Sequence, residues 1–148
     1  MTTHPSERRT LTVPGRPEQV AAARQFVTGA LGEGSPHGET AVLLVSELVT
    51  NSLRHSASAR DGGTITITVI TGLEGLVRVE VTDDGATSLP MVGAGCGSDE
   101  GGRGMQLVSV LASAWSCRRE GRRTTTWFEL EPERQEASVC PVAGAWAR

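Results

Sequence analysis

The chain has 148 residues, of which 38% are hydrophobic and 21% are charged, and its formal net charge is −3. This size suits one domain, and the composition excludes a chain that is disordered throughout. The acidic balance argues against a nucleic-acid binder, and no apolar run approaches the roughly 18 residues that a membrane span needs. The N-terminal residues lack the apolar core of a signal peptide, so we expect a cytoplasmic protein.

Residue usage excludes further classes of site. All 14 basic residues are arginine, which rules out a phosphate-binding loop of the G-x-x-x-x-G-K type and a Schiff-base lysine. Cys96, Cys117 and Cys140 are widely spaced and show no zinc-binding pattern, so we expect three reduced thiols. The three histidines show no metal-ligand spacing either.

The first third of the chain predicts a strand and two helices. Residues 11–13 are typical of a short strand, and a helix follows from Pro17 until Gly32 stops it. A second helix is predicted from Ser35, a cap residue followed by proline, to near His55. Its apolar stripe has helical spacing and consists of Ala41, Leu44, Val45, Leu48 and Ser52.

The pattern then changes from helical to alternating. Residues 63–71 and 76–82 alternate apolar and polar side chains around a glycine-containing turn, which predicts an antiparallel hairpin. Residues 83–104 contain seven glycines and little apolar periodicity. A loop of this length inside a compact domain is usually functional or disordered.

A third helix and two strands complete the patterned chain. The helix is predicted to carry Val108, Leu111, Ala112 and Trp115 on one face, and the strands cover residues 116–120 and 124–131. The resulting order predicts an α/β sandwich with one mixed, mostly antiparallel sheet and its helices packed on one face. We assign residues 10–131 to this domain and residues 1–9 and 132–148 to tails.

The segment ELVTNSLRHS, residues 47–56, places two polar side chains on the second helix. Glu47 and Asn51 are four residues apart, so they lie on the same side of the helix, one turn from each other. An asparagine offers a neutral oxygen to Mg²⁺, and a glutamate offers a general base. Taken alone, the pair is better explained as a solvated glutamate and an asparagine near a helix end.

Two further motifs follow. In VTDDGA, Asp83 and Asp84 come directly after an alternating strand and precede Gly85, where a carboxylate is able to accept a hydrogen bond from an amine. An ordinary Asp-Gly turn explains the same residues. In GGRGMQLV, Gly102 and Gly104 flank Arg103 at a predicted helix start, which is a favourable place for an anion. A loop that meets a helix is the simpler explanation of this motif alone.

In this order, the three motifs resemble the nucleotide site of the Bergerat-fold ATPase superfamily of gyrase, chaperone, histidine-kinase and mismatch-repair proteins. ELVTNSLRHS resembles its N box, DDG its first glycine box, GRGMQLV its second, and residues 86–101 its ATP lid. Together with the sequence TTTWFEL near the end, the chain is similar to bacterial anti-sigma-factor serine/threonine kinases over about residues 10–131. Thr87 stands where the first glycine box often has a second glycine.

The resemblance implies a role for each matching residue. Asn51 would hold Mg²⁺ against the ATP phosphates, Glu47 would be the general base, and Asp83 would bind the adenine amino group beside Gly85. The remaining matches are Gly102, Arg103, Gly104 and Met105 along the phosphates and the lid hinge, Arg54 and His55 near phosphate, and Thr125 near the adenine.

The same resemblance implies the activity and the partners. Such kinases use ATP and Mg²⁺, bind a sigma factor, phosphorylate an anti-anti-sigma antagonist and form homodimers, without direct contact to nucleic acid or membrane. A different class of function is a sequestering module that binds ATP, or no nucleotide, and transfers no phosphate. Phosphotransfer to an antagonist would discriminate between the two. A histidine autokinase fits less well, because the chain leaves no room for a dimerisation helix with a phosphoacceptor histidine.

Overall fold

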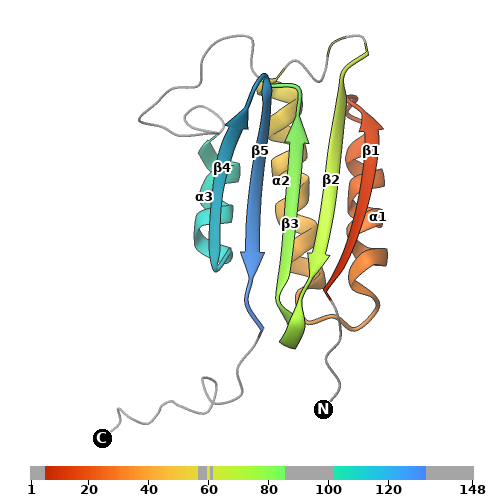
Figure 1. The fold of residues 1–148 in the computed structure, drawn as a ribbon, viewed down its shortest axis with the longest axis vertical. Helices are drawn as coiled ribbons and strands as arrows, with labels where there is room; N and C mark the ends of the chain where they lie inside the picture. The colour runs from red at the N-terminus through yellow and green to blue at the C-terminus, as the bar shows by residue number, and fades with distance from the viewer. Residues whose placement is uncertain (1–5, 57–59, 61, 86–101, 133–148) are drawn as a thin grey trace, which may run out of the picture.

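The computed structural model describes residues 6–56, 60, 62–85 and 102–132, in which a five-stranded sheet lies against three helices (Figure 1). None of the described helices is long and apolar enough to cross a membrane. The elements in chain order are β1 (Glu7–Pro14), α1 (Gln19–Leu31), α2 (Gly38–His55), β2 (Thr64–Thr71), the short 3-10 turn η2 (Leu73–Gly75), β3 (Val77–Asp83), α3 (Gly102–Leu111), β4 (Ala114–Glu120) and β5 (Arg123–Leu130).

The sheet has the strand order β1-β2-β3-β5-β4. All four pairings between the described strands are antiparallel, so the predicted fold class is confirmed but the expectation of a mixed sheet is wrong for this part of the chain. β2 and β3 form one hairpin, and β4 and β5 form another. The pairing of β3 with β5 joins the two hairpins into one sheet.

The three helices cover one face of the sheet, and α2 lies between the other two (Figure 1). The predicted apolar stripe of α2 is confirmed, because its members are all buried against β3 and the neighbouring helices. The strands contribute their inward-pointing valines and isoleucines to the same core. The largest fully buried side chains include Leu44, Leu48, Ile65, Ile67 and Phe128.

The turn between α1 and α2 explains why the second helix begins later than predicted. Gly32 ends α1 with a φ of 85°, a conformation that favours glycine. The Ser35 carbonyl accepts from Gly38 N at 3.1 Å, and the Ser35 hydroxyl accepts from His37 N at 3.2 Å. Ser35 therefore organises a turn before the helix, and regular α-helix begins only at Gly38.

Two other boundaries differ from the sequence prediction. β1 extends over Glu7–Pro14, because its polar first half pairs with β2 at the edge of the sheet, where the side chains stay exposed and show no apolar alternation. α3 ends at Leu111, which is 41% exposed, and Trp115 belongs to β4, where it pairs with Phe128. The helical spacing that linked Leu111 and Trp115 is therefore coincidental.

Candidate active site

The candidate site is built around Asp83, the last residue of β3. Val77, Val79 and Val81 point into the core, and Asp83 occupies the next inward position of the same strand. Its carboxylate Oδ2 accepts a hydrogen bond of 2.7 Å from the Ser52 hydroxyl on α2. This contact joins the end of the central strand to the helix that carries the N-box-like motif.

Asp83 is buried, with 8% of the residue's surface exposed. Burial raises the pKa of Asp83 above its ordinary value, and the charge of Asp84 acts in the same direction. The hydrogen bonds from Ser52 and from the Gly85 backbone oppose this rise and lower the pKa. A buried carboxylate with two donors and no cationic partner among the described residues is costly for folding, and such groups are enriched at functional sites.

Two backbone N–H groups donate to the two aspartates of the turn after β3. Gly85 N donates to Asp83 Oδ1 at 2.8 Å, and Thr64 N donates to Asp84 Oδ2 at 3.0 Å. Gly85 has a φ of 84°, and a Cβ at this position would collide with the carbonyl oxygen of Arg122 in the β4–β5 turn. Only glycine fits here, for both its conformation and its lack of a side chain.

The four predicted residues of α2 lie in its second half. Glu47 and Asn51 are half-buried, and Arg54 and His55 are exposed in the last turn. This end of α2 lies at the same end of the sheet as Asp83, as Figure 1 shows and the bond from Ser52 requires. Asn51 precedes Ser52 directly in the chain, so the N-box-like motif and Asp83 are brought together.

The second glycine motif forms the start of α3. Gly102, Arg103, Gly104 and Met105 are its first four residues, so their backbone N–H groups belong to a helix N-terminus. The Met105 side chain is 6% exposed and packs in the hydrophobic core. Its part in a ligand site would therefore come from its backbone. α3 packs against α2, which carries the first motif.

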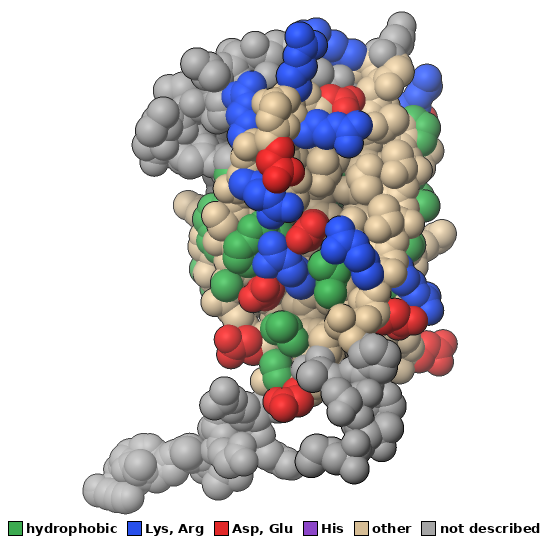
Figure 2. Space-filling model, in the orientation of Figure 1, with side chains coloured by type: hydrophobic (Ala, Val, Ile, Leu, Met, Phe, Trp, Pro, Cys, Tyr) green, Lys and Arg blue, Asp and Glu red, His purple; other side chains and the backbone are tan. Residues whose placement is uncertain are grey.

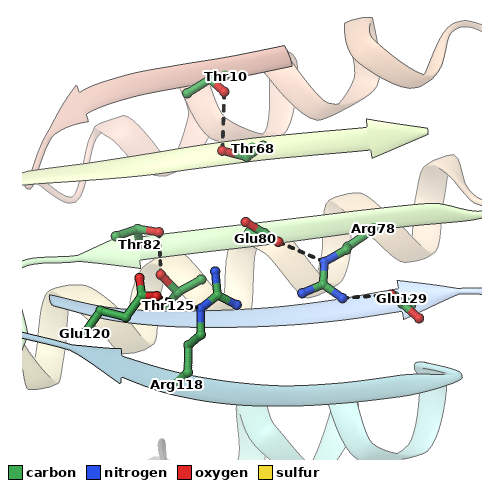
Figure 3. A network of polar contacts seen from close by, with 9 residues as sticks. All are labelled: Thr10, Thr68, Arg78, Glu80, Thr82, Arg118, Glu120, Thr125 and Glu129. Carbon is green, nitrogen blue, oxygen red and sulfur yellow. Dashed lines mark hydrogen bonds and ion pairs between the residues drawn. The ribbon is translucent and has the colours of Figure 1, made fainter. Parts of the chain in front are cut away.

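Thr125 is the one predicted residue that the register separates from the others. It pairs with Thr82, and the two hydroxyl oxygens lie 2.8 Å apart on the face of the sheet that no described helix covers (Figure 3). Its neighbour Thr124 lies directly across from Asp83 and therefore shares the helix-covered face. If a threonine of β5 approaches a ligand bound at Asp83, the register favours Thr124.

Sequence reasoning assigned no role in the site to Ser52. In the sequence Ser52 is a member of the apolar stripe of α2, and helical spacing alone gives a small polar residue there no special meaning. The signal available in the sequence was a hydroxyl on the buried face of the helix directly after Asn51. A buried polar side chain requires a partner, and Asp83 is that partner.

Three further sequence predictions concern the lid, the cysteines and metal binding. The lid assigned to residues 86–101 and Thr87 within it lie outside the described residues. Cys117 is disulfide-bonded in the structure, so the expectation of a reduced thiol is wrong for this residue. Among the described residues no three His, Cys, Asp or Glu side chains form a cluster that could hold a metal ion by themselves.

A groove of about 790 Å³ lies elsewhere, between the end of α1 and the first half of α2. Arg24, Glu39 and Leu43 are among the residues that line it, and it contains none of the predicted site residues. Asp83 contacts α2 near its other end, at Ser52. The groove therefore does not belong to the site that the motifs describe.

Comparison with known proteins places these features in a family. Residues 13–130 match the family described as the histidine kinase-like ATPase domain. No curated protein matches the sequence. Among solved structures, the crystal structure of the RsbU and RsbW domains of Rv1364c from Mycobacterium tuberculosis is similar, with a TM-score of 0.63 and 19% identity. The histidine kinase domain of the blue-light activated histidine kinase EL346 from Erythrobacter litoralis is also similar, with a TM-score of 0.55 and 22% identity.

Both likenesses cover most of this chain but only part of the other protein. The first covers 86% of this chain and 33% of the Mycobacterium chain, and the second covers 87% of this chain and 66% of the Erythrobacter chain. At these identities the comparisons show the fold.

Proposed function

Because the chain belongs to the histidine kinase-like ATPase domain family, we propose that it binds ATP with Mg²⁺ and acts as an anti-sigma serine/threonine protein kinase. The observation that carries the nucleotide site is the 2.7 Å hydrogen bond between Ser52 and Asp83. It joins two residues that lie 31 positions apart in the sequence and that belong to the motifs resembling the N box and the first glycine box.

The adenine end of the proposed site is Asp83. Its buried carboxylate would accept a hydrogen bond from the exocyclic amine of adenine, which is a donor that guanine lacks at the same ring position. The Gly85 backbone keeps the turn tight, so the chain stays close to the base. A small number of fixed polar groups at the edge of an apolar core is typical of a specific small-molecule site.

The phosphate end of the proposed site is the region between the second half of α2 and the start of α3. Backbone N–H groups of Gly102, Arg103 and Gly104 offer donors to phosphate oxygens, and the helix dipole of α3 favours an anion there. Arg54, exposed at the end of α2, would add positive charge, and the exposed His55 beside it would offer a ring N–H donor. This supports phosphate binding without a lysine.

The donor set near α2 fits Mg²⁺ better than a transition metal. Asn51 offers one neutral oxygen, and Mg²⁺ usually keeps several waters and is held mainly by substrate phosphates and one or two protein oxygens. The ion would neutralise charge on the phosphates. Glu47, one turn before Asn51, would orient the serine or threonine hydroxyl of a protein substrate and accept its proton as the oxygen attacks the γ-phosphorus and ADP leaves. Catalysis of this kind is mostly positioning and charge stabilisation.

The partners follow from the proposed class of kinase. The chain would sequester a sigma factor, phosphorylate an anti-anti-sigma antagonist and act as a homodimer in the cytoplasm, with no direct contact to nucleic acid or membrane. The support for these partners is the resemblance of the three motifs and of TTTWFEL to anti-sigma kinases. The similarity to a protein with an RsbW domain agrees with it at the level of the fold.

The nucleotide site is tested by titration calorimetry with ATP, with and without Mg²⁺. We expect the wild-type chain to bind ATP in a magnesium-dependent way and Asn51→Ala to lose at least about tenfold in affinity, since it removes a ligand to a charged group. Gln25→Ala, which removes an exposed side-chain amide from α1, is the matched control and should bind like the wild type. A wild-type chain that binds no ATP would refute the proposal.

Kinase activity is tested separately by transfer of phosphate from labelled ATP to an anti-anti-sigma protein. Glu47→Ala should abolish transfer while ATP binding persists, and Glu39→Ala, which removes an exposed carboxylate from the same helix, should leave transfer unchanged. Transfer that survives Glu47→Ala would exclude Glu47 as the base. ATP binding without transfer by the wild type would indicate the sequestering module instead.

A further inference from the structure

Each oxygen of the Asp83 carboxylate has its own donor. Oδ2 accepts from the Ser52 hydroxyl at 2.7 Å, and Oδ1 accepts from Gly85 N at 2.8 Å. One donor comes from α2 and the other from the turn that follows β3, so the carboxylate is held from two independent elements. A carboxylate oxygen has a second lone pair, so each one keeps the capacity to accept from a ligand.

The surroundings of Ser52 leave its hydroxyl little choice of partner. Ser52 is 7% exposed, and its neighbours on the buried side of α2 are apolar. Serine side chains inside helices often donate to the carbonyl oxygen four residues earlier, as Ser46 does to Val42 at 2.9 Å. Ser52 instead donates across the helix–strand interface to a charged acceptor, which is the stronger kind of hydrogen bond.

We propose that Ser52 is the positioning residue for nucleotide-base selection, because its hydroxyl fixes the orientation of the Asp83 carboxylate that would receive the adenine amine. This inference rests on the proposed function and deepens it. A carboxylate held in one orientation favours a base with an amino group and repels a base with a carbonyl oxygen at that position. Ser52 would therefore contribute to the preference for ATP over GTP.

The charge state of Asp83 supplies a second consequence. Burial and the neighbouring Asp84 raise the pKa of Asp83, whereas the Ser52 hydrogen bond lowers it. The charged and titratable groups that adjoin its contacts are Arg54 and His55, which follow Ser52 in α2, Arg123, which adjoins Thr124 opposite Asp83 on β5, and Arg119, which pairs with Thr124 from β4. These groups are present in both the wild type and Ser52→Ala, so they do not account for a difference in pKa between the two. Removing the hydroxyl therefore moves the protonation of Asp83 to higher pH.

The test compares Ser52→Ala with Ser46→Ala, two removals of a serine hydroxyl from the same helix. Binding of ATP and of GTP, each with Mg²⁺, is measured by calorimetry for both variants and the wild type between pH 5 and pH 8. Alanine favours helix, and circular dichroism verifies that both variants fold. For Ser52→Ala we expect about a tenfold loss of ATP affinity with little change for GTP, on the basis of a lost bond to a charged group. The acid limb of its ATP-binding profile should move to higher pH by about one unit.

The outcomes separate this inference from the proposed function. Ser46→Ala should match the wild type in all three measurements. If the wild type binds ATP but Ser52→Ala keeps the same ATP-to-GTP ratio and the same acid limb, the positioning role is refuted and the nucleotide site stands. An equal loss of ATP and GTP with an unmoved acid limb would also refute it, in favour of a purely structural contact. A wild type that binds no ATP refutes both.

Discussion

The two faces of the sheet use the same backbone for opposite purposes. On β3, Val77, Val79 and Val81 point toward the helices and are at most 4% exposed. The alternate residues Arg78, Glu80 and Thr82 point to the other face, which no described element covers (Figure 1). Figure 2 shows that outer face, where arginine and acidic side chains are interspersed over the strands.

Polar contacts between side chains of neighbouring strands order the outer face, although it is not apolar. Threonine pairs cross the strands, with hydroxyl oxygens 2.9 Å apart in Thr12–Thr66 and 2.8 Å apart in Thr82–Thr125. Arg78 bonds Glu80 and Glu129 at 2.8 Å each, as Figure 3 shows, and its guanidinium carbon lies 3.9 Å from the centre of the Trp127 ring. This face tolerates charged side chains at most positions, because each one is able to contact a polar partner or solvent.

The inner side of β3 is otherwise apolar, which makes its one charged position informative. Asp83 follows Val77, Val79 and Val81 at the same spacing, so it stands where the pattern calls for another valine. A carboxylate on the outer face would need no explanation. The candidate site is therefore marked by the exception to the inner pattern of β3, and not by the abundance of charge on the outer face.

The largest effect should come from adjacent aromatic residues of β5 that point to opposite faces. Phe128 is 0% exposed in the core, whereas Trp127 is half-buried on the outer face. We expect Phe128→Ala to lower the free energy of unfolding by about 4 kcal/mol and Trp127→Ala by about 1 kcal/mol, measured by urea denaturation. Equal losses would mean that the outer face is as deeply buried in solution as the core.

The next effect concerns the turn that ends the inner face. Gly85→Ala combines an unfavourable φ with a collision against the Arg122 carbonyl, so we expect a loss of about 3 kcal/mol or more. Gly121→Ala, at a φ of 63° with open space around it, should lose only about 1 kcal/mol. Similar losses in thermal unfolding would show that conformation alone, and not the contact with Arg122, requires glycine at residue 85.

Substitution of Arg78 tests whether its ion pairs with Glu80 and Glu129 stabilise the outer face. Burial lowers the pKa of Arg78, but the hydrogen bonds and charges of Glu80 and Glu129 together outweigh this effect, so the net pKa is raised. Arg78→Leu should lower the free energy of unfolding by about 1.5 kcal/mol, because it strands two partly buried carboxylates. Arg118→Leu, which breaks one exposed pair at 3.5 Å, should change it by less than about 0.5 kcal/mol. Indistinguishable variants would mean that the Arg78 network contributes nothing beyond an ordinary surface pair.

The smallest effect is a gain. Asp83→Asn keeps the shape of the side chain but removes a buried charge, so we expect the free energy of unfolding at pH 7 to rise by about 1 kcal/mol while ATP binding is lost. Because the folded pKa of Asp83 is raised, the folded chain binds the proton more tightly than the unfolded chain. The native carboxyl therefore costs stability as pH rises through its folded pKa, and the advantage of Asp83→Asn should shrink as pH falls toward 4. An advantage that does not vary with pH would contradict this account.

Patterns that repeat along one element could be predicted from the sequence, and contacts between elements could not. The valine alternation of β3 and the apolar stripe of α2 each follow a single period, so both were predicted correctly. The choice between Thr124 and Thr125 depends on which residue of β5 pairs with Asp83, and no local signal fixes that register. The same holds for Ser52, whose partner lies 31 residues away.

Other errors lie at edges of the sheet and at the ends of elements. The first half of β1 carries exposed polar residues because only one side of that strand is paired, so the alternation that identifies buried strands is missing. Trp115 extended the apparent helical spacing of α3 although the chain had already turned into β4. The sequence indicates only that glycine at residue 85 suits a turn, whereas the close approach of the Arg122 carbonyl is visible only in three dimensions.

The strand order has a consequence for folding kinetics. β2 pairs with β3 and β4 with β5 across short connections, so both hairpins close locally. The pairing of Asp83 with Thr124 must close a much longer loop, which contains α3 and β4, before the two halves of the sheet meet. Refolding followed by a probe near Asp83 should therefore report a later step than a probe in either hairpin, and nucleotide-binding competence should appear with that step.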